Sequence, residues 1–547
     1  MNNTNIPIAP AGGAIPDPIQ AGLAAGWRVT DCTRIGDDFA LEADVVIVGS
    51  GAGGGVSAEI LTLAGLRVII VEEGALKSSR DFKMREAEAY PALYQESAAR
   101  KTRDKAINIL QGRTVGGSTT VNWTTSFRTP PSTLAFWQRH HGLGDYTPEA
   151  LAPWFGMMEQ RLDIVEWAVP PNQNNELLRR GAAKLGVLTA VIHRNVKGCW
   201  NLGYCGMGCP TNAKQSMLVT TIPAALTHGA TLLTRLRAER LIFKGGRVEQ
   251  LQCAALQADG LETNGRRVTL RARHFVLSGG AINTPALLLR SAAPDPHGLL
   301  GKRTFLHPTV ISAGLFEQRV DGYAGAPQSI YSDHFLQTQA IDGAVGYKLE
   351  VPPLHPLLLS TTMAGFGAQH AALMRQFPHI QAMLALLRDG FHADAPGGSV
   401  AIDSAGAPVL DYAISPYLWD GVRRGLLSMA EIQFAAGARS VTPVHEQAGV
   451  YRTWREASAG INALPYKILA TRIVSAHVMG GCAMAGDERH GVTAPDGRYH
   501  GVENLSVHDG SLFPTSIGAN PQLSIYAITA RMASALARQL GGRPAPA

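Results

Sequence analysis

The chain has 547 residues, too many for one small core, so we expect two or more domains. Hydrophobic residues make up 46% and charged residues 17%, a balance typical of a globular protein and not of a disordered or fibrous one. The formal net charge is +6, and no run of Lys or Arg is interleaved with aromatic residues, so the sequence does not favour a nucleic-acid partner.

The cellular setting can be predicted only coarsely. Six cysteines are too few to form the disulfide framework of a secreted domain of this length, so they favour a reducing compartment. The first twenty residues lack the basic start and the apolar stretch of a secretory signal. No run of about 18 uncharged apolar residues predicts a transmembrane helix. We therefore expect a cytoplasmic protein.

A nucleotide-binding pattern begins at residue 44. Residues 44–48 (DVVIV) form the continuous apolar run of a strand buried on both faces, and glycines follow directly. Residues 56–66 have helical spacing. Residues 67–74 (RVIIVEEG) predict a second buried strand that ends in acid. Together they predict a βαβ unit of a parallel sheet.

The glycines after the first strand satisfy G-x-G-x-x-G. Gly49 would allow the turn, Gly51 would admit a pyrophosphate, and Gly54 would permit close helix packing. The phosphates would lie at the N-terminus of the following helix. Glu72, at the end of the second strand, would accept hydrogen bonds from ribose hydroxyls. The motif alone does not distinguish NAD from FAD.

Two later predicted strands and a change in the pattern of residue types indicate how the chain is divided into domains. Residues 273–278 (RHFVLS) and 504–508 (NLSVH) are short apolar segments that stop at glycine or acid, as strands do at a nucleotide site. Between about 311 and 469 the sequence changes to loops, aromatic residues and alternating segments such as 399–403 (SVAID) and 408–414 (PVLDYAI). These segments predict a second, mostly antiparallel domain inserted into the first.

Four separated motifs carry a family resemblance. Residues 112–122 (GRTVGGSTTVN), residues 280–288 (GAINTPALL) and the region from His477 to Pro521 follow the first glycine motif in order. This arrangement resembles the glucose-methanol-choline (GMC) oxidoreductases, which bind FAD. The resemblance implies an α/β fold with a Rossmann-like FAD-binding domain and an inserted α+β substrate domain on a mostly antiparallel sheet. We expect an N-terminal extension at 1–40, an FAD-binding domain at 41–131, 195–310 and 470–547, and a substrate domain at 132–194 and 311–469.

The resemblance also implies a set of FAD-binding residues. They would contact the pyrophosphate, the adenosine, the flavin or the ribityl chain: Gly49, Gly51, Gly54, Glu72, Arg113, Gly116, Gly117, Ser118, Asn122, Ala238, Asp509, Gly510 and Pro521. Some relatives attach the flavin covalently through a His just before the Asn of the second glycine loop. Val121 occupies that position here, so we expect non-covalent FAD.

Two residues near the C-terminus match the catalytic pair of the family. His477 lies in SAHVMGGC, and Asn520 lies in GANPQL at a position that is His or Asn in the family. A neutral imidazole can accept a hydroxyl proton near physiological pH, so His477 is the expected base. Asn520 would donate to the substrate oxygen. His307 and His508 are interpreted as residues that hydrogen-bond locally, without a catalytic role.

A cysteine segment lies between the glycine motifs. Cys199, Cys205 and Cys209 have the spacing C-x5-C-x3-C, which does not match the usual zinc or ferredoxin patterns, although C-x3-C-P resembles the end of an iron–sulfur run. We expect a structural loop and no metal. The segment is most similar to the YCGxGCPxxAK stretch of long-chain fatty alcohol oxidases and related bacterial alcohol dehydrogenases of the family.

That similarity bears on the substrate. Residues 346–360 and 361–367 are apolar and could line a hydrophobic channel, so we expect a primary, medium- to long-chain aliphatic alcohol that is oxidised to the aldehyde. A flavin-containing hydroxynitrile lyase of the same fold, or a GMC dehydrogenase acting on a sugar or polyol, is the alternative. A disulfide reductase ranks last, because a second G-x-G-x-x-G and a C-x4-C are missing.

The resemblance leaves the electron acceptor and the partners open. Oxygen, or a quinone or cytochrome, would reoxidise the flavin. Some members of the family work with a small partner subunit, so membrane association or export with such a partner is an alternative to the cytoplasmic location.

Overall fold

The structure, a computed structural model, describes residues 15–543. The predicted βαβ unit is present as β2 (Phe39–Val48), α2 (Ala52–Leu63) and β3 (Val68–Glu72). β2 and β3 pair in parallel, and every residue of β3 is buried. This burial on both faces explains the uninterrupted apolar run that the sequence shows there.

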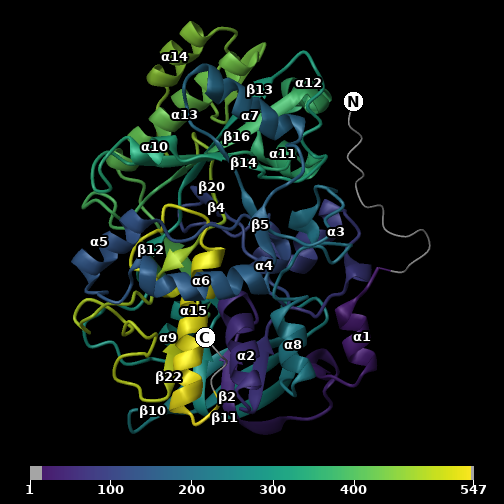
Figure 1. The fold of residues 1–547 in the computed structure, drawn as a ribbon, viewed down its shortest axis with the longest axis vertical. Coiled ribbons are helices and arrows are strands. Elements are labelled where there is room, and N and C mark those ends of the chain that lie inside the picture. The colour runs from purple at the N-terminus through teal and green to yellow at the C-terminus, as the bar shows by residue number, and fades with distance from the viewer. Residues whose placement is uncertain (1–14, 544–547) are drawn as a thin grey trace.

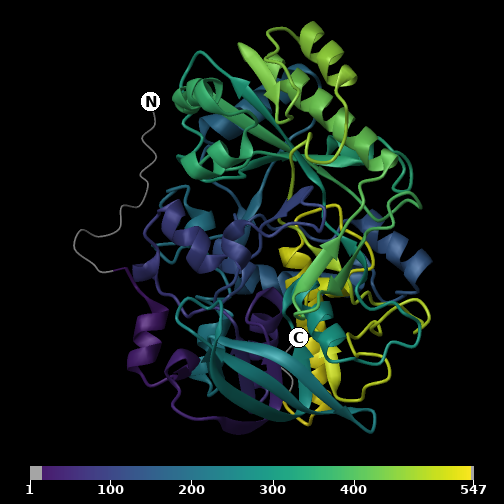
Figure 2. The ribbon, with the colours of Figure 1, turned by 180° about the vertical axis from the view of Figure 1, so that it is seen from behind.

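The first sheet has eight strands. Its order is β1 (Arg28–Asp31), β8 (Thr231–Thr234), β3, β2, β11 (Thr263–Leu277), β10 (Arg247–Leu256) and β9 (Leu236–Lys244), and β22 (Leu505–Val507) pairs with β11. The pairs from β1 to β11 are parallel, as is β11 with β22, whereas β9, β10 and β11 form an antiparallel meander. The meander forms the broad ribbon at the base of the molecule in Figure 2.

The second sheet also has eight strands, and most of its pairs are antiparallel. Its order is β4 (Ile107–Ile109), β20 (Ile473–Ser475), β13 (Thr309–Leu315), β16 (Ile380–Leu387), β15 (Tyr347–Glu350), β14 (Ile330–Ser332) and β6 (Ala190–Val191), with β19 (Ser440–Pro443) on β13. Only the pair β4–β20 is parallel. The predicted α/β fold with a second, mostly antiparallel domain is therefore confirmed.

The remaining named strands form two smaller sheets. One has the order β18 (Pro408–Asp411), β17 (Gly398–Ile402), β12 (Lys302–Phe305) and β21 (Met479–Gly480), and the other pairs β5 (Ile164–Glu166) with β7 (His193–Asn195). The alternating segments at 399–403 and 408–414 thus form the hairpin β17–β18.

The helices divide between the two sheets (Figure 1). On the side of the first sheet, α15 (Gln522–Gln539) packs on α2 and α6 (Pro148–Arg161), and α2 also contacts α8 (Thr221–Thr227). On the other side, α13 (Pro416–Ala436) packs on β13, β16 and α7 (Gln173–Lys184). The remaining helices are α1 (Pro18–Ala24), α3 (Glu86–Leu93), α4 (Ser118–Val121), α5 (Pro131–His141), α9 (Gly280–Arg290), α10 (His334–Gln337), α11 (Pro356–Thr362), α12 (Gly367–Arg375) and α14 (Trp454–Ala463).

Local sequence explains where α13 begins and ends. The Ser415 side chain accepts a hydrogen bond from the Leu418 N–H, and Pro416 fills the first helical position, where its missing N–H costs nothing. Gly437 ends the helix with φ of +103°, a left-handed conformation that favours glycine. The resulting helix covers the core of the second sheet.

Several contacts cross the expected domain boundaries, which remain a prediction. α6, within the expected substrate segment 132–194, packs on α15, and β12 pairs with β17 across the same boundary. The described part of the expected N-terminal extension contributes β1, which pairs with β8 and so belongs to the first sheet. β4 and β20, both expected in the FAD-binding domain, pair with each other at the edge of the second sheet. The sequence signals for these short strands are weak, because three or four residues carry little periodicity.

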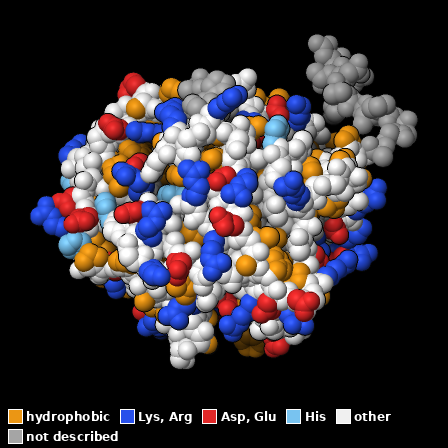
Figure 3. Space-filling view, turned by 90° about the horizontal axis from the view of Figure 1, so that it is seen from below, with side chains coloured by type: hydrophobic (Ala, Val, Ile, Leu, Met, Phe, Trp, Pro, Cys, Tyr) orange, Lys and Arg blue, Asp and Glu red, His pale blue; other side chains and the backbone are white. Residues whose placement is uncertain are grey.

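No helix within residues 15–543 is both long and apolar enough to cross a membrane. Figure 3 shows the face seen from below, where Lys and Arg side chains are interspersed with Asp and Glu. On this face the net positive charge does not gather into one field of a single sign.

The close approach of α2 to β22 depends on glycine. A Cβ atom on Gly53 would lie 1.6 Å from the carbonyl oxygen of His508, and one on Gly54 would lie 1.9 Å from the carbonyl oxygen of Gly49. Both neighbours are backbone atoms, which cannot turn away as a flexible side chain can. The start of α2 therefore lies directly against His508 and Asp509, the residues that follow β22.

We predict that Gly53→Ala destabilises the protein, by about 1–3 kcal/mol or more, because the new methyl group forces the two backbones apart. The measurement is thermal unfolding monitored by circular dichroism. Gly156→Ala in α6 is the matched control, since a Cβ there meets nothing within 4 Å, and we expect it to stabilise by about 0.4–1 kcal/mol. Equal melting temperatures for the two variants would contradict this account of the close approach.

Candidate active site

A cavity of about 810 Å³ lies where the two sheets meet. The carboxyl ends of β2, β3, β11 and β22 open into it through Val48, Glu72, Ser278 and Asp509. Ligands of open parallel sheets bind in this position, outside the carboxyl ends of the strands. The second sheet closes the opposite end of the cavity with residues of β13, β16 and β20.

Two glycine loops face each other in the middle of the cavity. Gly51 is the N-cap of α2 and makes no side-chain cap, so the first N–H groups of the helix stay free to bind an anion. Gly117 lies opposite with φ of +53°, and a Cβ atom on it would lie 2.8 Å from the Gly51 Cα. Only glycine leaves room here for a phosphate chain beside the backbone.

The carboxylate of Glu72 is held at the end of β3. Its Oε2 accepts hydrogen bonds from the Ser50 N–H at 3.1 Å and from the Ser50 hydroxyl at 2.5 Å, and its Oε1 accepts one from the Gly74 N–H at 2.7 Å. Burial raises its pKa, while these bonds act in the opposite direction. The Ser50 hydroxyl in turn accepts from the Gly116 N–H at 3.0 Å, so the first and second glycine loops are joined.

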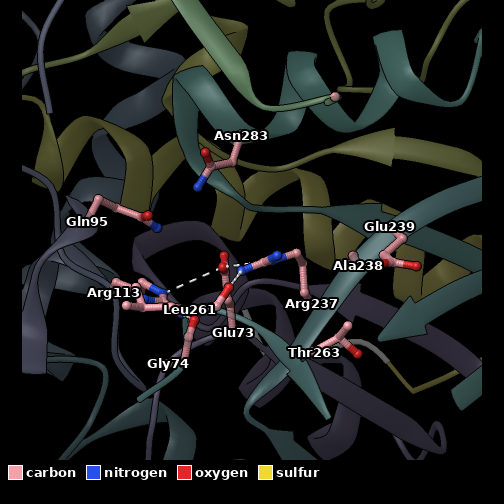
Figure 4. Close-up of polar contacts among 12 residues, drawn as sticks. Glu73, Gly74, Gln95, Arg113, Arg237, Ala238, Glu239, Leu261, Thr263 and Asn283 are labelled. Carbon is pink, nitrogen blue, oxygen red and sulfur yellow. Dashed lines mark hydrogen bonds and ion pairs between the residues drawn. The ribbon is translucent and has the colours of Figure 1, made fainter. Parts of the chain in front are cut away.

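Figure 4 shows the end of the cavity beyond Glu72. Glu73 lies between two guanidinium groups, 3.0 Å from Arg237 and 3.5 Å from Arg113. Arg113 also donates to the Gly260 carbonyl. Ala238 on β9 lies beside this cluster and also lines the cavity. Charged and backbone groups thus surround the end where the adenosine was expected.

Most of the residues that the sequence predicts for FAD line this one cavity. They are Gly49, Gly51, Glu72, Arg113, Gly117, Ser118, Asn122, Ala238, Asp509, Gly510 and Pro521. Gly54 and Gly116 do not line it. Gly54 packs on the backbone of Gly49, and Gly116, with φ of +87°, packs against Thr120 and Leu218. Their glycine identity is explained by packing and not by cofactor contact.

Asp509 ties the end of β22 to the start of α9. Its Oδ2 accepts hydrogen bonds from the Gly280 N–H at 2.8 Å and the Thr284 hydroxyl at 2.6 Å, and its Oδ1 accepts one from the Ser511 N–H at 2.8 Å. Burial raises its pKa. The neighbouring His508 hydrogen-bonds Ser57 through Nδ1 at 2.9 Å, a local role of the kind the sequence analysis gave it. The Asp509 carboxylate thus connects two motifs that are distant in the sequence.

The two predicted catalytic residues lie together at the other end of the cavity. Asn520 Nδ2 is 3.4 Å from His477 Nε2, and both residues line the cavity wall. Behind them lies His307, whose Nδ1 is 3.2 Å from the Nδ1 of His477. Burial, followed by the charge of Lys348, lowers the pKa of His477 to about 4, so this imidazole is neutral at physiological pH.

The ring of His307 is held from its other side. The Gly518 N–H donates to His307 Nε2 at 3.1 Å. His477 thus contacts Asn520 through Nε2 and His307 through Nδ1, and the backbone of residue 518 fixes His307 in turn.

Asn520 is oriented from the opposite side. Its Nδ2 donates to Glu350 Oε2 at 3.3 Å, and Gln328 donates to the same oxygen at 2.6 Å. Burial raises the pKa of Glu350 to about 7. Asn520 Nδ2 and His477 Nε2 thus lie 3.4 Å apart at the cavity wall, where the amide can donate to a bound oxygen atom and the imidazole can accept the proton of that oxygen.

The wall next to these donors is apolar. Leu384 and Leu386 of β16, Val474 of β20 and Trp123 line it, with Thr309 and Gln328 as polar neighbours. The predicted channel segments at 346–360 and 361–367 do not line the cavity. Leu354, Leu359 and Met363 from these segments pack behind Leu384 and Leu386, so the channel prediction was wrong. Sequence reasoning missed β16 because a strand buried on both faces has no alternation that marks one side.

The cysteine segment packs against the second glycine loop. The buried ammonium of Lys214 donates to three carbonyls, those of Thr120 at 2.6 Å, Asn122 at 2.9 Å and Cys205 at 2.7 Å. Cys199, Cys205 and Cys209 are free and partly buried. Within the part of the chain that the structure describes, no three His, Cys, Asp or Glu side chains are placed to hold a metal ion. Lys214 thus fixes this segment to the backbone that precedes Trp123.

We predict a pH signature of the buried Lys214. Burial lowers its pKa from 10.5 to about 8, so between these values the unfolded chain binds more protons than the folded one, and the stability contributed by this group rises with pH. The variant Lys214→Met has no group whose contribution to stability rises with pH, and it also loses three hydrogen bonds. Its melting temperature should therefore lie below that of the parent by an amount that grows from pH 8 to pH 10. The exposed Lys244→Met controls for the loss of one charge. A gap that stays constant or narrows across this range would refute the assignment.

Comparison with known proteins gives the family. Sequence profiles described as GMC oxidoreductase match residues 90–309 and 395–529. An uncharacterized GMC-type oxidoreductase of Mycobacterium tuberculosis is 31% identical over 494 residues, which cover 90% of this chain and 75% of that protein. Long-chain-alcohol oxidase FAO1 of Arabidopsis thaliana is 26% identical over 95% of this chain and 70% of its own length.

Solved structures show the same fold. Formate oxidase of Aspergillus oryzae has a TM-score of 0.65 at 15% identity, covering 92% of this chain and 100% of that one. Pyridoxine 4-oxidase from Mesorbium loti has a TM-score of 0.64 at 18% identity, covering 91% and 98%. With these matches on a Rossmann-like sheet and a glycine-lined cavity, the chain belongs to the GMC oxidoreductases and is an FAD-binding flavoprotein.

Proposed function

We propose that this protein oxidises a primary, medium- to long-chain aliphatic alcohol to the aldehyde with non-covalently bound FAD. The observation that carries the proposal is that His477 Nε2 and Asn520 Nδ2 converge beside an apolar wall of the cavity. An imidazole nitrogen can accept a hydroxyl proton, an amide N–H can stabilise the oxygen on which negative charge develops, and the apolar wall suits an alkyl chain.

The cavity suits FAD as the cofactor. The free N–H groups at the start of α2 and the facing glycines Gly51 and Gly117 would take the pyrophosphate, and Glu72 would take the adenosine ribose. Ser118, Asn122, Asp509 and Gly510 would hold the flavin half. In this proposal the first sheet and its helices form the FAD-binding domain, and the second sheet forms the substrate domain. FAD, when bound, accepts the hydride from the carbinol carbon.

The attachment of FAD follows from one residue. Val121 lies on the cavity wall in the second glycine loop and has no nucleophilic atom to form a bond with a flavin. We therefore propose that FAD dissociates, so that acid or chaotrope should release it into solution.

His477 and Asn520 have related roles in the proposed reaction. Asn520 donates to the hydroxyl oxygen of the alcohol and stabilises the negative charge that develops there. His477 accepts the hydroxyl proton at Nε2 as the hydride leaves the carbinol carbon for FAD. Glu350, in its ionised form, accepts from Asn520 and keeps the Nδ2 group turned to the cavity.

The substrate class rests on the cavity wall and on relatives. Leu384, Leu386 and Val474 offer an alkyl chain apolar contact but offer a sugar few hydroxyl-binding groups. Arabidopsis relatives described as long-chain-alcohol oxidases match most of this chain. We propose oxygen, or a quinone or cytochrome that receives electrons directly or through a small partner subunit, as the final acceptor.

We predict that alcohols of about six carbons or more bleach the flavin of the anaerobic protein faster than ethanol, glucose or glycerol, because each buried methylene adds about 0.8 kcal/mol of apolar contact. The measurement is flavin absorbance during titration with alcohols from two to sixteen carbons. Admission of oxygen or of a quinone dye then shows which acceptor restores the colour. Faster bleaching by polyols would support the alternative substrate class, and no bleaching by any alcohol would end the proposal in favour of a lyase.

We predict that His477→Ala slows flavin reduction by about 10²-fold or more, because the group that accepts the hydroxyl proton is lost. His477→Gln should be nearly as slow, since its amide can donate a hydrogen bond but cannot take up a proton. Both variants should keep their FAD, which an absorbance spectrum checks. A rate for His477→Gln close to that of the parent would refute the base role.

A further inference from the structure

Exposed apolar side chains gather around the hairpin that α11 and α12 form. Phe366, in the turn between the two helices, is 90% exposed, and Leu357 in the first turn of α11 is also exposed. Met84 and Leu202 are exposed on two other segments that contact the start of α11. We call these four residues the hairpin patch. Single exposed apolar residues are common, but a group drawn from separate segments marks an interaction surface.

Hydrogen bonds hold the segments of the hairpin patch together. The Glu86 carboxylate accepts two N–H groups from the first turn of α11, each at 2.7 Å, and Met84 lies two residues before Glu86. The Gly203 carbonyl, next to Leu202, is 3.3 Å from Nε2 of His355, the residue that precedes α11. α3, which begins at Glu86, lies on the same side of the molecule as α11 and α12 (Figure 1).

The turn between the helices presents Phe366 to the outside. Gly365 and Gly367 have φ of +95° and +62°, in the left-handed region that favours glycine. A Cβ atom on either glycine would meet nothing within 4 Å, so the turn stands clear of the rest of the protein. α12 follows directly and has no fully buried residue. The tip of the hairpin therefore projects from the molecule.

The inner side of the hairpin packs on one face of β16. Leu359, Met363 and Leu373 contribute to a hydrophobic cluster on this face. Side chains of a strand alternate between its two faces, so the same face carries Leu384 and Leu386, which belong to the cluster and also line the cavity. Continuous apolar packing thus connects the hairpin with the candidate active site.

The charges around the hairpin patch favour a negatively charged partner. Residues 351–388, which contain the hairpin, have two Arg and no Asp, Glu or Lys. Residues 77–88, around Met84, have four basic and three acidic side chains. Lys83 and Arg375 are exposed, and neither forms an ion pair within the described part of the chain. Basic groups beside an exposed apolar tip are complementary to anionic lipid headgroups.

We propose that the hairpin patch docks this protein on an anionic lipid bilayer, with Phe366 among the acyl chains and Lys83 and Arg375 at the headgroups. A second copy of the chain is a weaker candidate for the partner. Symmetric pairing through this patch would bring the same basic groups of two copies together, and like charges across an interface oppose association.

Docking on a bilayer would supply a substrate that water holds poorly. Each added methylene shifts an alcohol from water toward lipid by about fourfold, so an alcohol of sixteen carbons resides in the membrane. The apolar face of β16 under the hairpin then leads such a molecule toward Leu384 and Leu386. This purpose rests on the proposed function, whereas binding to the bilayer does not.

The first test is sedimentation of the FAD-loaded protein with vesicles of phosphatidylcholine and phosphatidylglycerol. We expect the parent to bind and Phe366→Ser to bind about tenfold more weakly or worse, because a large apolar side chain no longer leaves water. Phe366→Trp should retain binding. Leu63→Ser, which removes an exposed leucine from the last residue of α2, is the control and should bind like the parent. A parent that stays in the supernatant, or a Phe366→Ser variant that binds like the parent, would overturn the proposal.

The second test separates lipid charge from other partners. Lys83→Gln and Arg375→Gln should each weaken binding to the mixed vesicles by about fivefold and leave binding to pure phosphatidylcholine nearly unchanged. Equal binding of the parent to both kinds of vesicle would refute the anionic preference. Sedimentation velocity without vesicles tests pairing of copies. A dimer that Phe366→Ser converts to a monomer would assign the patch to that pairing and overturn docking on lipid.

The third test links docking to the substrate. The parent and Phe366→Ser are compared on hexadecanol held in the mixed vesicles and on hexanol in solution. The ratio of the hexadecanol rate to the hexanol rate should fall about tenfold in the variant, in line with its loss of vesicle binding. An unchanged ratio would refute delivery from the bilayer. If the parent oxidises neither alcohol, the proposed function fails, and the sedimentation results still decide whether the hairpin patch binds lipid.

Discussion

The whole site depends on one close backbone contact, where the start of α2 meets the exit of β22 without room for a Cβ atom. The contact brings the N-terminal glycine loop, built from residues 49–54, against Asp509, which lies more than 450 residues later in the chain. Asp509 then reaches Gly280 at the start of α9. Segments separated by hundreds of residues therefore form one cavity wall, because the parallel strands β2, β11 and β22 end at the same edge of the sheet and glycine lets α2 approach the backbone there.

Burial decides the electrostatic character of the active site. It lowers the pKa of His477 and His307, which favours neutral imidazoles near physiological pH, and it raises the pKa of Glu350 to about 7. Neutral imidazoles and amides attract few counterions, and hydrogen bonds fix the direction of their dipoles before a substrate binds. Prepared dipoles of this kind stabilise a developing charge without the cost of reorganising the surroundings.

Local sequence patterns predicted the parts of this protein that local physics determines. The runs at 44–48 and 67–74 became β2 and β3 because continuous apolar sequence demands burial on both faces, and the intervening glycines demand a helix close to the sheet. The roles of His307, Glu350 and Leu384 were out of reach, because each depends on register between strands that are distant in the chain. His307 is an isolated His before Pro308, and nothing in the local sequence predicts that the Gly518 N–H will donate to its ring.

Register also explains why the reactive end of the cavity lies at the boundary of two sheets. Within either sheet, His307 and His477 would be separated by the ladder, with their side chains directed to one face or the other. At the crossing between β12 and β13, and between β20 and β21, the ladder is interrupted and the two rings turn toward each other. The strand pairs on either side of the interruption remain intact. The two imidazole rings can therefore contact each other, while β12, β13, β20 and β21 fix the distance between them. A site placed there combines the rigidity of a sheet with the free side-chain direction of a loop.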